Sequence, residues 1–190
     1  MESEIKRCDW VTKDPIYIKY HDEEWGKPEY NSERLFELLC LEGQQAGLSW
    51  LTVLKKRENY WNAFCNFKPE EIIKLKEEYL KNLLNDSKII KHKGKIESIV
   101  NNAKCYIAMS EKDEEFATFV WSFVRNKPII NEWEDCKDIP TENEMSRAMS
   151  KALKRNGFKF VGATICYSFM QACGLINDHI KSCVSYNKYI

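Results

Sequence analysis

Apolar residues recur every three to four positions along most of the chain, and no stretch alternates convincingly between apolar and polar residues. The first period is typical of helices and the second of strands. The pattern therefore predicts an all-α fold, with helices near residues 32–43, 49–64, 70–84, 94–109, 114–125, 143–155 and 161–173. The aromatic N-terminal segment and the tail after Gly174 lack this period, so something other than amphipathic packing must hold them.

Length and composition narrow the class of protein. At 190 residues the chain can bury a core without disulfides, and we expect one domain over residues 1–190. Its content of 44% hydrophobic and 31% charged residues excludes a disordered or fibrous class. The N-terminus has no apolar signal region, and the uncharged run 160–177 holds too many polar residues for a membrane span. We therefore expect a cytoplasmic protein with no membrane partner.

Positive charge gathers in two turns although the formal net charge is +0. The turns "KRNGFKFVGATI" and "SKIIKHKGKIESI" each contain glycine and lead into a predicted helix, where main-chain N–H groups can point at an anion. Two neighbouring turns of this kind could grip a DNA backbone without reading bases. Their candidate contacts are Lys154, Arg155, Gly157, Lys159, Gly162, Lys93, Gly94 and Lys95. The alternative for each is a plain glycine-capped connection with solvated lysines.

The two non-periodic ends each carry a pair of possible metal ligands. Cys8 and His21 lie near the N-terminus, and His179 and Cys183 lie near the C-terminus. Thiolate and imidazole groups in a tetrahedral arrangement suit Zn²⁺, and four protein ligands leave no open position for catalysis. The set would form a clasp between the termini. The alternative is four unrelated side chains, because the order Cys-His-His-Cys is not a zinc-finger pattern.

Glu42, in the run "LEGQQAGLSWLTVL", stands where an apolar residue is expected. Helical spacing puts it on the same face as Leu35, Leu38 and Leu39, so its carboxylate is aimed inward. Burying an ionised carboxylate costs on the order of several kcal/mol unless hydrogen bonds or a positive partner compensate. Glu42 must therefore have an internal partner or face a cavity.

Aromatic residues offer one answer, because their faces can stack on a flat ring and attract it further if it is positively charged. The candidates are Trp10, Tyr17, Tyr20, Trp25 and Trp50. The alternative is that these rings belong to the core and that Glu42 pairs with an internal Arg or Lys. Leu48, on the turn after Gly47, is an apolar residue that could protrude as a wedge.

Together these stretches resemble the 3-methyladenine DNA glycosylase I family of the helix-hairpin-helix superfamily. The resemblance covers nearly all of the chain, and the runs "GQQAGLSW" and "GFKFVG" are its most specific motifs. It implies a helix-hairpin-helix glycosylase fold of two helical lobes, with a base-binding cleft between them and the hairpin at about residues 154–164. It also implies one structural Zn²⁺ per chain, because the ligands of the family match Cys8, His21, His179 and Cys183.

The resemblance also implies roles for the other candidates. Glu42, Tyr20 and Trp50 match the residues that recognise the methylated base, with Glu42 as the catalytic residue. The remaining walls of the base site match Trp10, Tyr17 and Trp25. The run "RNGFKFVGAT", which includes Val161, matches the hairpin that grips the DNA backbone, and Leu48 beside Gly47 matches the intercalating residue.

The implied activity is hydrolytic excision of 3-methyladenine from double-stranded DNA in base excision repair. Lyase-type members of the superfamily place a lysine nucleophile where this chain has Thr164, so strand cutting is not expected. Asp178 is the nearest counterpart of the usual catalytic aspartate, and it could instead orient His179. We expect a monomer that needs no protein partner. The alternative from another class is a non-catalytic, zinc-stabilised helical module that binds DNA or a protein.

Overall fold

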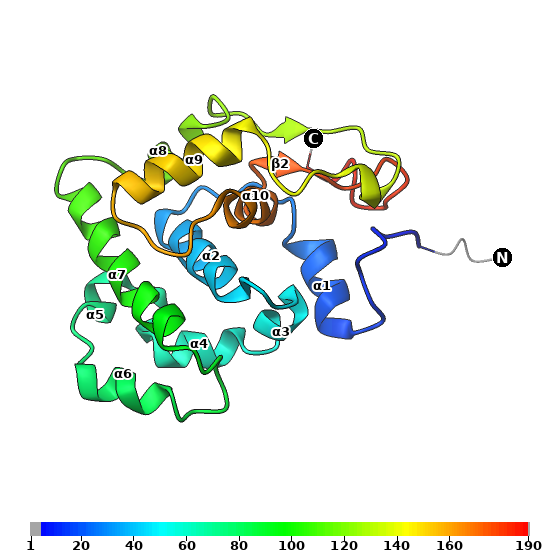
Figure 1. Ribbon diagram of the computed structural model, residues 1–190. Helices are drawn as coiled ribbons and strands as arrows, with labels where there is room; N and C mark the ends of the chain where they lie inside the picture. Colours follow the sequence, from blue (N-terminus) through cyan, green and yellow to red (C-terminus); the bar gives the residue numbers. More distant parts are fainter. Residues whose placement is uncertain (1–4, 190) are drawn as a thin grey trace.

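The computed structural model describes residues 5–189, and these form a mostly helical fold (Figure 1). Its α-helices are α1 (Pro15–Glu23), α2 (Ser32–Gln45), α3 (Trp50–Leu54), α4 (Arg57–Ala63), α5 (Pro69–Ile72), α6 (Glu77–Leu83), α7 (Lys93–Ser110), α8 (Phe116–Ser122), α9 (Glu144–Arg155) and α10 (Ala163–Ala172). Two short 3₁₀ helices are also described: η1 (Cys65–Phe67) lies between α4 and α5, and η2 (Cys136–Asp138) precedes α9. No described helix combines the length and the apolar character needed to cross a membrane.

Helical periodicity locates the long helices well and the short ones less well. The predictions at 32–43, 94–109, 143–155 and 161–173 are confirmed to within a few residues. The predictions of single helices at 49–64 and 70–84 are wrong, since each range holds two short helices. No glycine or proline marks either break, so the periodicity runs across it. Packing of the surrounding helices, and not local propensity, decides these ends.

The N-terminal segment is not irregular throughout, because it contains helix α1. Asp14 caps this helix by accepting a hydrogen bond from the main-chain N–H of Ile16 at 3.1 Å, and Pro15 occupies its first turn. Only Tyr20 and His21 of α1 are buried, so the helix has no apolar stripe to reveal it.

The strictly all-α prediction also needs a small correction. Two short strands, β1 (Ile129–Ile130) and β2 (Ile176–Asn177), pair in parallel with Ile129 opposite Ile176. A two-residue strand is too short to show alternation, and therefore no sequence pattern marks it. The pairing ties the tail after α10 to the segment after α8.

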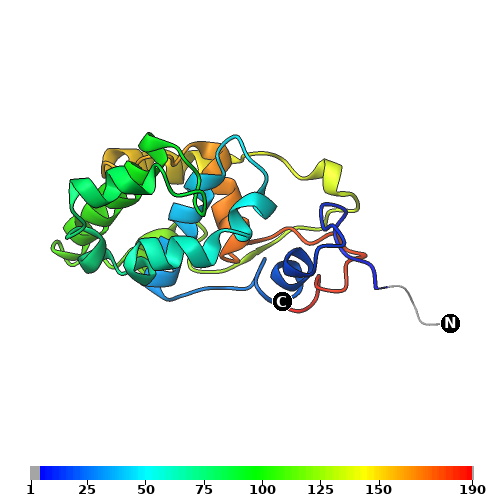
Figure 2. The same ribbon diagram turned by 90° about the horizontal axis from the view of Figure 1, so that it is seen from below.

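The core consists of two hydrophobic clusters that meet near the N-terminal end of α3. In the larger cluster α2 lies centrally and contacts α7, α8 and α10, and α9 packs on α10 (Figure 1). The smaller cluster joins the two ends of the chain and includes Tyr20, Trp25 and Ile180. Trp50 packs against both clusters. Both terminal segments lie on the same side of the molecule as α1 (Figures 1 and 2), as a clasp between them would require.

Candidate active site

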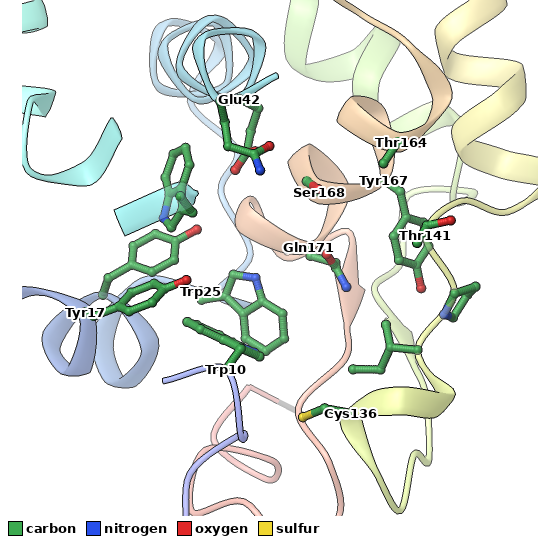
Figure 3. Close-up of a pocket in the computed structure, with 15 residues that line it drawn as sticks. Trp10, Tyr17, Trp25, Glu42, Cys136, Thr141, Thr164, Tyr167, Ser168 and Gln171 are labelled. Carbon is green, nitrogen blue, oxygen red and sulfur yellow. The ribbon is translucent and has the colours of Figure 1, made fainter. Parts of the chain in front are cut away.

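A cavity of about 350 Å³ opens between α1, α2, α3 and α10 and the loop around residues 136–141 (Figure 3). One side of it is lined by every residue predicted for the base site, namely Trp10, Tyr17, Tyr20, Trp25, Glu42 and Trp50. The other side is formed mainly by polar residues of α10, namely Thr164, Tyr167, Ser168 and Gln171. The cavity is in the size range of small-molecule sites. The structure thus brings the predicted base-site residues together.

Glu42 lies near the C-terminal end of α2 and points into this cavity (Figure 3). Its residue is only 3% exposed, and within residues 5–189 no side chain or main-chain N–H donates a hydrogen bond to its carboxyl group. The nearby cations are engaged elsewhere: Arg57 pairs with Glu24 at 2.6 Å, and Lys95 donates to main-chain carbonyls. Burial raises the pKa of Glu42 to about 8. The internal Arg or Lys partner that the sequence left open is not found in the described chain.

The aromatic rings beside Glu42 form a tilted, interlocking wall. The ring centroids of Tyr20 and Trp50 are 5.4 Å apart at 48°, and those of Trp10 and Trp25 are 4.9 Å apart at 73°. Burial, and then the negative charge of Glu42, raises the pKa of Tyr20 well above its usual value. The Tyr20 hydroxyl therefore stays protonated and can donate a hydrogen bond inside the cavity.

Cys8, His21, His179 and Cys183 converge at the joined ends of the chain, and their ligand atoms all lie within 4.8 Å of one another. Cys183 Sγ is 3.4 Å from His21 Nε2 and 3.5 Å from His179 Nδ1, and Cys8 Sγ is 3.6 Å from the same Nδ1. Zinc bonds of about 2.0–2.3 Å in a tetrahedron place neighbouring ligand atoms roughly 3.5 Å apart. The spacing of these four groups therefore fits a zinc ion.

The remaining nitrogen of each histidine is also held. His21 Nδ1 lies 2.7 Å from Asp22 Oδ1, and His179 Nε2 lies 3.0 Å from the carbonyl oxygen of Trp25. Such partners select the tautomer whose other nitrogen is free to bind a metal. The ligand cluster also supports the cavity, because the Trp25 ring packs edge-on against His179 at 4.6 Å between centroids.

The last turn of α9 exposes the basic residues Lys154 and Arg155, and the connection to α10 exposes Lys159. Gly157 takes a φ of +87°, which favours glycine, and its carbonyl accepts a hydrogen bond from Asn101 of α7. Asn102 fixes the next part of the loop by bonding both the N–H and the carbonyl of Lys159. These amides give the turn a defined shape.

The end of this loop presents main chain and not side chain. Val161 is buried as a whole residue, and its carbonyl accepts a hydrogen bond from Ser150, so of the two hairpin residues Val161 and Gly162 only Gly162 can face outward. Helix α10 begins after Gly162 without a side-chain cap, which leaves its first N–H groups free for an anion.

The second basic turn lies beside the first, because the ring of Phe160 packs against His92 at 6.0 Å between centroids and near Gly94. Lys93 is exposed. Lys95, also predicted to contact DNA, is buried instead, and its ammonium group donates to the carbonyls of Gln44 at 2.8 Å and Ala46 at 2.6 Å. The prediction for Lys95 is therefore wrong, because its charge caps the C-terminus of α2.

The turn after α2 carries the predicted wedge. Leu48 is 39% exposed, and Gly47 before it takes a φ of +76° with open space around its α-carbon. Gln45, which lines the cavity, donates to the carbonyl of Leu48 at 3.0 Å. The turn thus holds an apolar side chain at the rim of the cavity.

Asp178 does not orient His179, contrary to the role considered from the sequence. Its carboxylate is fully buried and accepts hydrogen bonds from side chains of α10 and of the segment after β1. Three α10 residues that line the cavity, Tyr167, Ser168 and Gln171, were missed as site residues. Thr164, Ser168 and Gln171 recur at i, i+4 and i+7 along an otherwise apolar helix, and this polar stripe was the available signal.

Similarity to known proteins extends over nearly the whole chain. The methyladenine glycosylase family model matches residues 10–186. The chain is 55% identical over 182 residues to DNA-3-methyladenine glycosylase 1 of Escherichia coli (strain K12), covering 96% of this chain and 97% of that protein. It is 54% identical over 177 residues to DNA-3-methyladenine glycosylase of Haemophilus influenzae, covering 93% and 96%.

The fold agrees with solved structures of such enzymes. A crystal structure of 3-methyladenine DNA glycosylase I matches with a TM-score of 0.94 at 57% identity, covering 95% of this chain and 100% of that one. The Staphylococcus aureus enzyme, solved to explain its recognition of 3-methyladenine, matches with a TM-score of 0.93 at 41% identity and covers 99% and 100%. This chain therefore belongs to the methyladenine glycosylase family.

Proposed function

We propose that this chain is a monofunctional glycosylase that flips 3-methyladenine out of double-stranded DNA and hydrolyses its N-glycosidic bond, a step of base excision repair. One observation carries the proposal: Glu42 is a buried carboxyl group without a partner in residues 5–189, and it lies in a cavity walled by aromatic rings. The relatives support the same reaction, because those of E. coli and H. influenzae are DNA-3-methyladenine glycosylases.

The chemistry of the lesion leaves little for the protein to do. Methylation at N3 makes adenine a cation, which weakens the glycosidic bond and turns the base into a good leaving group without a general acid. The protein must extrude the nucleotide, at a cost of about a few kcal/mol, and hold the base where the damaged form fits better than the normal one. Water then attacks the sugar at C1′, the electron pair of the breaking bond goes to the purine, which leaves as a neutral base, and the extra proton of the water passes to solvent.

Glu42 supplies the selective contact. In the empty cavity its pKa of about 8 keeps most of the group neutral at pH 7, and an entering cation favours the carboxylate. The carboxylate accepts a hydrogen bond from the exocyclic amine, while Tyr20 offers a second polar contact and Trp50 stacks on the ring. Neutral adenine gains less from this charge and is bound less well.

Release of bases from methylated DNA tests the proposal. The wild-type protein should release 3-methyladenine, detected by chromatography, and Glu42→Gln should be about a hundredfold slower because a charge-assisted hydrogen bond is lost. Glu37→Gln is a matched control, since Glu37 is also buried in α2 but pairs with Arg34 outside the cavity. An unchanged rate for Glu42→Gln would show that Glu42 is only structural.

We also propose that Cys8, His21, His179 and Cys183 hold one structural Zn²⁺ that joins the two ends of the chain. The ligand spacing, the second hydrogen bond of each histidine and the burial of all four residues support it. Zinc supplies no catalytic step here, because no ligand position is left open. Elemental analysis should find about one zinc per folded chain. A folded, active protein without metal would contradict this.

The α9–loop–α10 unit is proposed to grip the DNA backbone as a helix-hairpin-helix motif, and Leu48 to fill the space that the flipped base leaves. The exposed cations and the uncapped start of α10 support this role. Neutralising Lys154, Arg155 and Lys159 should weaken binding to all sequences alike and flatten its salt dependence. An unchanged affinity for DNA would favour the alternative, in which this loop is a glycine-capped connection and its basic side chains contact only solvent.

Two alternatives predict different results. A lyase-type glycosylase would form an imine to DNA that borohydride traps, whereas at the equivalent position this chain has Thr164, a neutral residue at the cavity wall. A non-catalytic binding module would bind DNA and release no base. The partnerless carboxyl group in an aromatic cavity favours the enzyme, because a binding module has no use for it.

A further inference from the structure

Asp178 is a buried carboxylate behind the cavity wall that the reaction above does not use. Asn131 Nδ2 and Trp133 Nε1 each donate to its Oδ1 at 2.7 Å. Tyr167 Oη and Gln171 Nε2 donate to its Oδ2 at 2.7 and 2.8 Å. The carboxylate therefore organises α10 and the segment after β1 through hydrogen bonds alone.

This network fixes which way the amide of Gln171 points. A side-chain amide has one NH₂ group and one carbonyl, and a carboxylate can only accept hydrogen bonds. Gln171 must therefore turn its NH₂ toward Asp178, which leaves Oε1 on the other side. Gln171 lines the cavity (Figure 3), and no residue from 5 to 189 donates to its Oε1. The network thus presents a hydrogen-bond acceptor to the cavity.

We propose that Asp178 is a positioning residue that orients Gln171 so that Oε1 accepts a hydrogen bond from the exocyclic amine of the flipped base. The inference rests on the proposed function and adds a specificity contact to it. In an N3-methylated adenine nucleotide the exocyclic amine carries the only N–H hydrogens of the base. Guanine presents a carbonyl oxygen at the same position, which an acceptor repels. The site should therefore prefer 3-methyladenine to 3-methylguanine.

Replacing one accepting oxygen of Asp178 by a donating NH₂ group tests the orientation of the Gln171 amide. In Asp178→Asn, the indole N–H of Trp133 can only donate, so the introduced carbonyl stays on its side and the introduced NH₂ faces Gln171. Gln171 must then turn over and present NH₂ to the cavity. We expect the affinity for free 3-methyladenine, measured by calorimetry, to fall at least about tenfold. The NH₂ group of Gln171 would then face the exocyclic amine of the base, and both groups are hydrogen-bond donors.

A second substitution should restore the acceptor. In the double variant Asp178→Asn with Gln171→Glu, the introduced carboxylate accepts from the introduced amide with one oxygen and offers the other to the base. Affinity should return to within about threefold of the wild type. A purely structural defect at Asp178 would not be repaired by this exchange. Zinc content and melting temperature should be recorded for each variant, because Asp178 precedes His179.

Two single variants complete the set. Gln171→Met keeps the shape and removes the acceptor, so affinity should fall about tenfold without a change in Asp178. Asn131→Ala removes a donor to Oδ1, on the side of Asp178 away from Gln171, and should leave affinity unchanged. If Asp178→Asn does not fold, wild-type affinity in Gln171→Met still overturns the inference, because this variant removes the acceptor that Asp178 is proposed to orient.

The outcomes separate this inference from the proposed function. A wild-type protein that neither binds nor releases 3-methyladenine contradicts the function itself. Wild-type binding combined with wild-type affinity in Gln171→Met overturns the inference and leaves the function standing. A folded Asp178→Asn variant with weak binding that the double exchange does not repair overturns the positioning role. Equal release of 3-methylguanine and 3-methyladenine by the wild type contradicts the specificity contact.

Discussion

Glu42 and Asp178 are both buried carboxyl groups, Glu42 lining the cavity and Asp178 lying behind its wall, yet their surroundings are opposite. Glu42 has no hydrogen-bond partner within residues 5–189, and burial raises its pKa to about 8. Asp178 is fully buried, but side chains donate to both of its oxygens at 2.7–2.8 Å. A satisfied buried carboxylate holds a structure together, whereas an unsatisfied one destabilises the empty protein and gains its partner from a ligand.

The largest expected effect is a loss of stability when the carboxylate of Asp178 is removed. Asp178→Ala leaves the buried donor of Tyr167 and the half-buried donors of Trp133 and Gln171 without an acceptor. We expect the free energy of unfolding, from urea titration, to fall on the order of 4 kcal/mol. A fall below about 1 kcal/mol would mean that water replaces the carboxylate and that the contrast with Glu42 is not energetic.

Glu42→Gln should change stability in the opposite direction. The folded-state pKa of about 8 lies above the usual value of 4.5, so the unfolded chain releases this proton first as pH rises. The contribution of Glu42 to stability is complete below the unfolded pKa and is lost progressively as pH approaches 8. A glutamine does not titrate, so Glu42→Gln does not lose stability as pH rises. Its free energy of unfolding at pH 7 should be about 2 to 3 kcal/mol higher than that of the wild type.

Unfolding titrations at pH 5 and pH 7 measure the effect, and the advantage of the variant should grow between them. Glu37→Gln, which breaks an ion pair to Arg34, is the control and should not gain stability with pH. A constant difference between wild type and Glu42→Gln would mean that Glu42 is already ionised in the folded protein.

The same titration should shape catalysis. Because kcat/KM reports groups of the free enzyme, it should rise as Glu42 ionises, about fivefold between pH 7 and pH 8. The phenols of Tyr17 and Tyr20 face Glu42 and stay protonated over this range, since burial raises both of their pKa values. The profile should be flat in Glu42→Gln. A rise that persists in the variant would assign the titration to another group.

The sequence predicted the position of Glu42 but not the hydrogen-bond network of Asp178, and the reason is physical. Glu42 breaks the apolar stripe of a long helix, and that is a local pattern. The partners of Asp178 come from segments far apart in the chain, and nothing in its neighbourhood predicts that they meet. The breaks within 49–64 and 70–84 were missed for the same reason, because packing decides them, whereas helix α1 was missed because it has no apolar stripe. Gln171 did leave a local signal in the polar stripe of α10.

Lys93 and Lys95 extend the contrast to buried and exposed cations within one basic turn. The sequence gives no reason to distinguish these two lysines. In the structure, however, Lys95 is buried and donates to the carbonyls at the C-terminal end of α2, and burial lowers its pKa. Lys95→Met should lower the free energy of unfolding by about 1 to 3 kcal/mol and leave the salt dependence of DNA binding unchanged. Lys93→Met should leave stability unchanged and reduce the salt slope by about one.

Denaturation and DNA binding at several salt concentrations measure both quantities for the two variants. A reduced salt slope in Lys95→Met, with the fold intact, would mean that its ammonium group leaves the α2 carbonyls to meet a phosphate. In that case α2 would lose its cap when DNA binds, and the turn carrying Leu48 would be free to move with it. An unchanged slope means that Lys95 stays on the α2 carbonyls when DNA binds and keeps the turn that carries Leu48 in place.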